Sequence, residues 1–201
     1  MTIDFLGISL QSYSWQTVLG SSISGVFLGS IYALVALGLT LIYGVLHIIN
    51  FAHGSLLMLA MYAVFFLWNI LGLDPYLSML IVVPGGYLFG YTLQRTIIGK
   101  ASHGKDEITL LVMLGVSIVM ENTALFFFTA TDRSVRVPYD LDGFDLGVTY
   151  VVYPEIAALL GSLLITLVLW FFMSYTDTGK AIRAVSKERQ GARLVGINVE
   201  H

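Results

Sequence analysis

The 201-residue sequence contains no cysteine, and its charged side chains are few. The absence of cysteine excludes disulfide bonds, thiolate nucleophiles and cysteine-ligated metal sites. Only 11% of the residues are charged, and no Asp, Glu, Lys or Arg occurs between Phe5 and Leu73. The net charge is −3, so the chain has no basic field that would attract nucleic acid, and nucleic acid is not an expected partner.

The chain is rich in apolar residues. They make up 57% of the chain and give a mean hydropathy of +0.83, which is far above the range of soluble globular domains. A helix needs about 20 apolar residues to cross a hydrocarbon layer of roughly 30 Å. Five segments meet or nearly meet this length, and they cover residues 17–42, 55–73, 75–94, 108–130 and 150–174. The sequence predicts an all-α, polytopic integral membrane protein in which residues 1–201 form a single membrane-spanning domain.

The positions of Lys and Arg predict the orientation of the spans, because cationic loops are retained on the cytoplasmic side. Arg95, Lys100 and Lys105 follow the third span, and five further cations lie between Lys180 and Arg193 after the fifth. We expect both segments to be cytoplasmic. The N-terminus carries no cation, and we expect it outside, together with the acidic segment between the fourth and fifth spans.

A polar break interrupts the apolar run at Asn50, His53 and Gly54. A helix drawn from residue 17 to residue 46 would be about 45 Å long, which exceeds the thickness of the hydrocarbon layer. We therefore expect the helix to break between residues 43 and 54. The residues alone indicate a polar break at the cytoplasmic end of the first span.

Glu121 is the carboxylate that lies deep within a predicted span. An ionisable group in this position usually faces the bundle interior or a wet cavity and pairs with a hydrogen-bond donor. Two interpretations remain open for Glu121. It forms a structural hydrogen bond between helices, with Asn122 or a hydroxyl group as the neighbour, or it takes part in a translocation path.

The third predicted span contains Pro84, followed by Gly85 and Gly86, at its centre. Proline removes a backbone donor and clashes with the preceding turn, so we expect a kink or an unwound turn there. The kink serves either helix packing or the lining of a path, because an opened backbone at membrane depth must face protein or water.

Residues 99–106, GKASHGKD, have the spacing of a phosphate-binding P-loop. The last position of that motif needs Ser or Thr to hold magnesium, whereas this chain has Asp106, followed by Glu107. We expect that the chain binds no ATP, no other cofactor and no metal. No catalytic motif is present either, so we expect no enzymatic activity.

Residues 177–198 differ from the spans, because apolar and charged residues alternate along them with a helical period. The apolar positions are Ala181, Ile182, Ala184, Val185, Ala192 and Val195. We expect an amphipathic cytoplasmic helix that Gly191 interrupts and Gly196 ends. It lies on the lipid of the inner leaflet or inserts into a groove of a soluble partner.

Two long stretches resemble one family. GLTLIYGVLHIINFAHG (residues 38–54) and GKAIRAVSKERQGARLVGIN (residues 179–198) closely resemble the permease subunits of the branched-chain amino acid ABC importers, the Liv type. The SIVMEN element and the order of the spans are also similar to that family. The resemblance implies that the polar break lies near the gate, and a plain interfacial turn is the alternative. The candidate residues of the path or gate are Asn50, Phe51, His53, Gly54 and Glu121.

The same resemblance implies that residues 177–198 are the cytoplasmic coupling loop, through which an ATPase moves the permease. The candidate contact residues are Val185, Glu188, Ala192, Gly196 and Ile197. The chain departs from the family pattern at one point. The acid and the first alanine of an acidic-alanine-alanine element are replaced by Gln190 and Gly191, and the strength of coupling is the property that this departure affects.

The family implies a set of partners for the chain. These are ATP-binding-cassette ATPase subunits that use the ATP, a second permease subunit in a heterodimer, an extracytoplasmic solute-binding protein and membrane lipid. The expected location is the inner or plasma membrane of a prokaryote. Permeases of this family continue with further spans after the coupling loop, so we expect this chain to be truncated at its C-terminus. The alternative functions are an ABC permease for urea or short amides and an ATP-independent secondary transporter.

Overall fold

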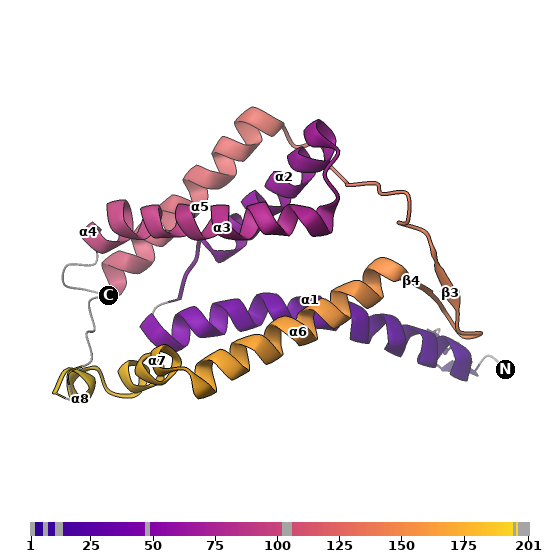
Figure 1. Cartoon of the computed structure of the whole chain (residues 1–201). Coiled ribbons are helices and arrows are strands. Elements are labelled where there is room, and N and C mark those ends of the chain that lie inside the picture. The colour runs from indigo at the N-terminus through magenta and orange to yellow at the C-terminus, as the bar shows by residue number, and fades with distance from the viewer. Residues whose placement is uncertain are drawn as a thin grey trace. The chain divides into compact units, whose positions relative to one another are not determined.

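A computed structural model of the chain describes residues 3–5, 8–10, 14–46, 49–101, 106–194 and 196 (Figure 1). Five of its helices are long and apolar enough to cross a membrane. The prediction of an all-α, polytopic membrane protein with five spans is therefore confirmed. The chain divides into two compact units, one of residues 1–37 and 138–180, the other of residues 38–137 and 181–201.

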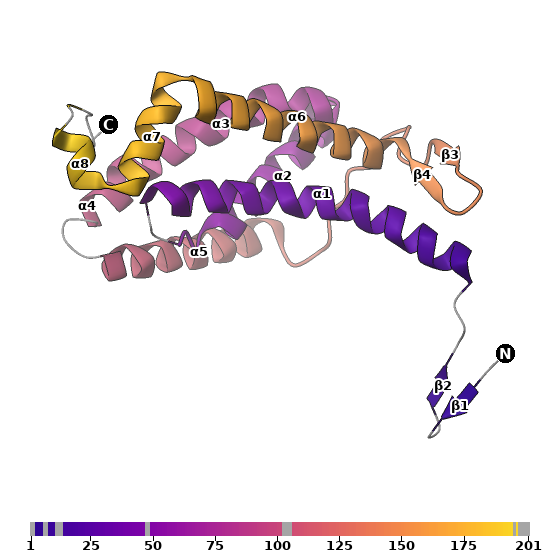
Figure 2. The same cartoon turned by 90° about the horizontal axis from the view of Figure 1, so that it is seen from below.

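The first unit combines two helical spans with two short β-hairpins. It contains β1 (Ile3–Phe5), β2 (Ile8–Leu10), the first part of α1 (Trp15–Leu46), β3 (Gly143–Asp145), β4 (Tyr150–Val152) and α6 (Tyr153–Tyr175). In each hairpin the strands are antiparallel, and β1 pairs with β2 as β3 pairs with β4 (Figure 2). No pattern in the sequence predicted these hairpins.

The β3–β4 hairpin packs on the N-terminal part of α1. The Leu146 N–H donates to Thr149 O at 3.0 Å and closes the hairpin turn. A Cβ atom added to Gly20 of α1 would lie 3.2 Å from the carbonyl oxygen of Val148 in that turn. Gly20 therefore allows the hairpin backbone to approach the helix closely.

The second unit is built around three helical spans that follow the end of α1. These elements are α2 (His53–Leu71), α3 (Pro75–Leu93), the π-helix η1 (Gln94–Ile98), α4 (Gly99–Ala101) and α5 (Asp106–Phe128). A three-residue connection joins α2 to α3. Gly72, with a φ of 63°, ends α2, and the Asp74 carboxylate accepts a hydrogen bond from Tyr76 N at 2.9 Å at the start of α3.

Helix α2 packs against both α3 and α5, and a small buried cluster lies at the start of α2. The cluster consists of Ala52, Ile98 and Met113, with Leu93 and Val116 packed against it. It joins the residue before α2 to the end of η1 and to α5. The start of α2 is thus held between the two neighbouring helices.

Two expectations about helix continuity have different outcomes. Helix α1 ends at Leu46 and α2 begins at His53, so the break predicted between residues 43 and 54 is confirmed. Of the kink or unwound turn predicted at Pro84, the unwound turn is wrong, because α3 continues through Pro84 as a helix. The kink stays a prediction. The irregular turn of this span lies instead in η1, where the wider π-helical turn follows α3.

The segment after α6 forms two helices, α7 (Asp177–Lys187) and α8 (Arg189–Leu194). The predicted amphipathic helix is present, but its interruption falls at Glu188, and the expectation for Gly191 is wrong because Gly191 lies within α8. Gly196 has a φ of 82° and lies beyond the end of α8, as a terminating glycine does.

Candidate functional site

The polar break forms a tight turn that leads into α2. The Asn50 carboxamide oxygen accepts a hydrogen bond from Ala52 N at 2.9 Å, and Asn50 O accepts one from His53 N at 3.1 Å. Asn50 is buried, whereas Phe51 points outward with half of its surface exposed. The Asn50 side chain therefore holds the backbone of the turn, which is a structural task that a short polar residue performs well.

His53 lies against α1 at a glycine. A Cβ atom on Gly38 would lie 3.3 Å from His53 Cε1, so the glycine leaves room for the imidazole ring. Helix α1 continues from Gly38 for eight more residues to Leu46, a rise of about 12 Å. The chain therefore turns back after α1 and returns to the level of Gly38 before α2 begins.

Glu121 lies beside the same turn, because it is bound through Ser55, the residue that follows Gly54. The Ser55 hydroxyl donates to Glu121 Oε1 at 2.8 Å, and the Ser117 hydroxyl donates to the same oxygen at 2.9 Å. The two serine oxygens are 2.6 Å apart. Both serines are buried, while the Glu121 residue is otherwise exposed on the surface of its unit.

These contacts decide between the neighbours that the sequence proposed for Glu121. Hydroxyl groups bind the carboxylate, as one alternative predicted. Asn122 does not, because its amide nitrogen donates to Ile118 O at 2.8 Å within α5. Ser117 is four residues before Glu121 and could have been found from that spacing, since positions i and i+4 share a helix face. Ser55 is 66 residues away from Glu121 in the sequence, so no local spacing indicated this contact.

The contacts of the polar turn place it along the length of α5. Ser117 is the middle residue of α5, the helix Asp106–Phe128 that is long and apolar enough to span the membrane. Ser55, at the start of α2, lies at hydrogen-bond distance from it. The polar turn therefore lies beside the middle of α5. Its assignment to the cytoplasmic end of the first span stays a prediction.

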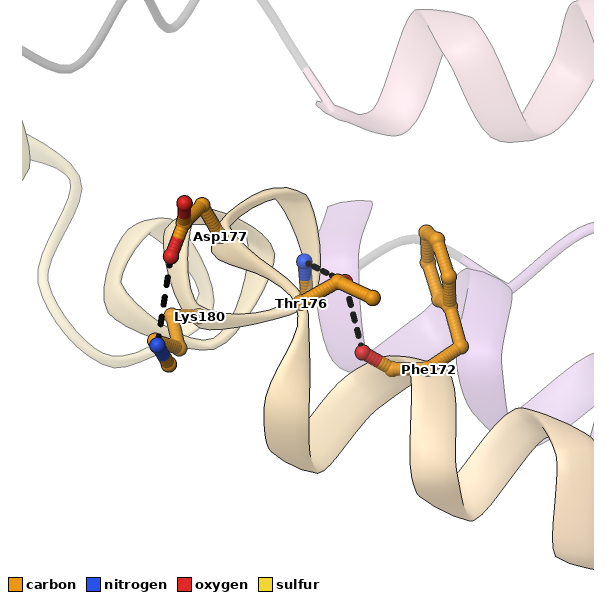
Figure 3. Close-up of polar contacts among 5 residues, drawn as sticks. Phe172, Thr176, Asp177 and Lys180 are labelled. Carbon is orange, nitrogen blue, oxygen red and sulfur yellow. Dashed lines mark hydrogen bonds and ion pairs between the residues drawn. The ribbon is translucent and has the colours of Figure 1, made fainter.

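A second candidate site is the corner where α6 meets α7 (Figure 3). Thr176 has an extended backbone between the two helices, and its hydroxyl donates to Phe172 O at 2.6 Å. The same hydroxyl oxygen accepts a hydrogen bond from Gly179 N at 3.0 Å, and Thr176 O accepts one from Lys180 N at 3.0 Å. Thr176 thus caps the end of α6 and the start of α7 at once.

Gly179 makes this corner compact. A Cβ atom at this position would lie 2.4 Å from Phe172 O and 2.6 Å from Met173 Cα, which are backbone atoms that cannot turn aside. The first turn of α7 therefore packs directly on the last turns of α6. An exposed ion pair of 3.2 Å between Lys180 and Asp177 lies on the outer side of the corner (Figure 3).

The residues proposed to contact an ATPase have different surroundings. Val185 is half-buried on α7, and Glu188 is exposed between α7 and α8. Ala192 is only 4% exposed, so its methyl group already packs inside the chain. Gly196 is exposed at the turn after α8, and Ile197 lies outside the described residues. Val185 and Glu188 are thus the candidates that a partner can still reach, together with Gly196.

Cofactor and metal sites were not expected in this chain. Within the described residues, no group of three or more His, Asp or Glu side chains is arranged to hold a metal ion. The residues that resemble a P-loop fall partly outside the description, because residues 102–105 are not described.

Comparisons with known proteins identify relatives over most of the chain. The family described as branched-chain amino acid transport system / permease component matches residues 21–201. The high-affinity branched-chain amino acid transport system permease protein LivH of Salmonella typhimurium is 30% identical over 196 residues, which cover 88% of this chain and 61% of that protein. The corresponding protein BraD of Pseudomonas aeruginosa is 29% identical over 190 residues, with the same shares covered.

A further relative has a similar description. The probable branched-chain amino acid transport permease protein LivH of Methanocaldococcus jannaschii is 28% identical over 190 residues, or 85% of this chain and 56% of that protein. The chain thus spans about three fifths of the length of the curated relatives that it matches. No solved structure matches it significantly.

Proposed function

Because the chain belongs to the branched-chain amino acid transport permease family, we propose that it is a transmembrane permease subunit of an ATP-binding-cassette importer for branched-chain or related amino acids. It is a multi-pass membrane protein with five helices long and apolar enough to span the bilayer. In this proposal it resides in the inner membrane of a prokaryotic cell and contributes part of the translocation path.

One observation carries the proposal of a path. The turn at Asn50 and the Ser55–Ser117–Glu121 cluster lie beside the midpoint of α5. Irregular backbone and an ionisable side chain are costly in lipid, and at this depth they are tolerated where they face protein or line a water-filled cavity. A permease satisfies this requirement, because its path supplies a polar environment at mid-membrane. Broken helices near the midplane are also how many transporters form their solute sites.

The proposed partners follow from the family and from the α6–α7 corner. Separate ATPase subunits hydrolyse ATP and contact α7 and α8, a second permease subunit completes the path, and a solute-binding protein delivers the amino acid from outside. This chain binds no ATP and catalyses no reaction of its own. The apolar residues of α7, such as Val185, are half-buried, whereas its charged residues are exposed. An amphipathic helix of this kind can place its apolar face in a groove of a partner protein.

Reconstitution with the partner proteins tests this function. An affinity-tagged chain is co-expressed with the ATP-binding-cassette ATPases, the second permease and the solute-binding protein of its own cell. We expect the ATPases to co-purify with the tag and the complex to import leucine into liposomes only when ATP is supplied. Leucine uptake without ATP would indicate a secondary transporter instead. Uptake of urea or a short amide in preference to leucine would correct the substrate class.

A further inference from the structure

A cavity of about 1020 Å³ extends along α2 in the second unit, between α2, the first half of α3 and the residues that follow α5. Its lining reaches from Gly54 to Phe65 on α2, a rise of roughly 16 Å. One end of the cavity therefore lies beside the polar turn. The wall is mostly apolar and includes Leu57, Met58, Met61, Phe65, Val82 and Val83. Its volume is close to the upper end of the range of about 300–1000 Å³ that small-molecule sites occupy.

The Arg133 guanidinium group lies at this cavity beside Phe65, an aromatic residue of its wall, and near two further rings. The Arg133 Cζ atom is 5.4 Å from the ring centroid of Phe65, and 5.9 Å from those of Phe66 and Phe128. Its Nη2 atom also donates to Phe128 O at 3.0 Å. Arg133 is an exposed residue, and stacking on aromatic rings together with the backbone bond favours this position of its charge.

Arg133 retains hydrogen-bonding capacity. A guanidinium group has five N–H donors, and among the described residues Phe128 is the acceptor that it uses. Asp132 lines the same cavity, and the two side chains form no ion pair with each other in the described part of the chain. A cation with unused donors and a separate carboxylate therefore lie at one end of a largely apolar space.

From this arrangement we propose that the cavity is a binding site for a zwitterionic amino acid with an apolar side chain. The ligand carboxylate binds the Arg133 guanidinium, its ammonium group binds the Asp132 carboxylate, and its side chain packs along the methionines and Phe65. Charge-assisted bonds to the guanidinium supply orientation, and the apolar wall supplies selectivity for aliphatic side chains. The inference rests on the proposed function, because it identifies an amino acid site within the permease.

The charges distinguish this ligand from an anionic lipid. An anionic phospholipid would match Arg133 and the apolar wall, but its negative headgroup would meet the like charge of Asp132 at the same rim. An amino acid zwitterion matches both side chains. The cavity also ends at Gly54, next to Ser55 and the polar cluster, so a ligand there is directed toward the midpoint of α5.

Equilibrium binding of radiolabelled leucine to the purified chain in phosphatidylcholine nanodiscs tests the proposal. We expect saturable binding that leucine displaces about tenfold better than leucinamide, which lacks the carboxylate, or 4-methylpentanoate, which lacks the ammonium group. Glycine, which lacks the side chain, should compete poorly. Arg133→Gln should weaken leucine binding about tenfold, and Asp132→Asn should weaken the preference for leucine over 4-methylpentanoate.

Arg136 provides the matched control, because it is a cation three residues further on that does not line the cavity. Arg136→Gln should bind leucine as the wild type does. The proposal is wrong if the wild-type chain shows no saturable leucine binding, if leucinamide competes as well as leucine, or if Arg133→Gln binds normally. Displacement of leucine by added phosphatidylglycerol would assign the cavity to lipid. The ligand competition uses the wild-type chain, so its result remains a test of the proposal even if a variant misfolds.

The two proposals can fail separately. ATP-dependent uptake by the reconstituted complex tests the permease function and requires the partner proteins, whereas leucine binding to the chain alone tests the cavity. A complex that imports leucine with the same KM in the wild type and in Arg133→Gln would overturn the cavity site and leave the permease function standing.

Discussion

The Ser55 hydroxyl of α2 donates a hydrogen bond of 2.8 Å to Oε1 of Glu121 on α5. This contact joins the residue after a polar turn to a carboxylate near the centre of a membrane-spanning helix. Ser117 completes the contact from the same helix as Glu121. A carboxylate in this position costs less when donors are already oriented toward it. The cluster therefore orders the junction between the polar turn and α5.

Replacement of Glu121 tests what this contact contributes. Glu121→Gln keeps an oxygen acceptor for both serines and should melt close to the wild type in detergent. Glu121→Leu leaves the Ser55 and Ser117 hydroxyls with only each other and should melt at a lower temperature. A fluorescence-based thermal melt of the purified variants measures the difference. Identical melting of the two variants, together with normal uptake by both, would mean that the carboxylate is incidental.

Replacement of Gly179 tests the α6–α7 corner. Gly179→Ala places a methyl group within 2.4–2.8 Å of backbone atoms of Phe172 and Met173, so the two helices must separate. We expect at least a several-fold loss of ATP-driven uptake, because α7 no longer has a fixed position on α6. Gly161→Ala is the control, since a Cβ atom there meets nothing within 4 Å in the same helix α6. Normal uptake by Gly179→Ala would show that the corner needs no close packing.

Replacement of Val185 tests the docking of α7 on an ATPase. Val185→Asp puts a charge on the apolar side of the helix and should release the ATPase or uncouple ATP hydrolysis from uptake. Lys187→Gln removes an exposed charge from the same helix and should have little effect. Ala192→Asp should act differently, because Ala192 is buried and its replacement disturbs folding. Co-purification of the ATPase with a tagged chain measures the first effect.

The control compares docking with binding to lipid. A helix that lies on the inner leaflet depends on cations near anionic headgroups as well as on apolar area. If Lys187→Gln and Val185→Asp reduce uptake equally while the ATPase still co-purifies with both, the membrane-surface interpretation replaces docking.

Cysteine labelling tests the predicted orientation, which follows from the distribution of cations. The chain has no cysteine of its own, so all labelling of a variant comes from the single cysteine that was introduced. Leu141→Cys, at a position that is 81% exposed, should react with an impermeant maleimide in whole cells. Lys187→Cys should react only after the cells are permeabilised. The reverse pattern would invert the topology.

Much of the architecture could be predicted from the sequence because membrane insertion depends on the length and hydropathy of a segment. The five spans and the break after α1 follow from runs of apolar residues and their interruption at Asn50. Boundaries were less accurate where polar residues continue a helix. Helix α1 begins at Trp15 and reaches Leu46, because the serines and glycines near its ends remain helical.

The details of the candidate sites depend on contacts that no local pattern encodes. Ser55 meets Glu121 across 66 residues, and the depth of the turn follows only from that contact. Gly179 was part of a recognised stretch, yet its close approach to Phe172 depends on how α7 folds back. Gly191 was expected to interrupt the tail on propensity alone, but a glycine is tolerated inside a short helix whose neighbours pack.

The contact between Gly20 and the β3–β4 hairpin has a consequence for the geometry of α1 in the bilayer. Short strands with open edges do not occur in lipid hydrocarbon, so the hairpin and Gly20 lie at the membrane surface. From there to Leu46, α1 has 26 residues and a length of about 39 Å, against a hydrocarbon thickness of roughly 30 Å.

A helix with this hydrophobic mismatch reaches both surfaces when it is tilted by about 40° from the bilayer normal, at the upper end of the usual range. Its two ends are then offset sideways by about 25 Å, as follows from that length and tilt. The two ends of this part of α1, at Gly20 and at Leu46, therefore contact different neighbours in the plane of the membrane.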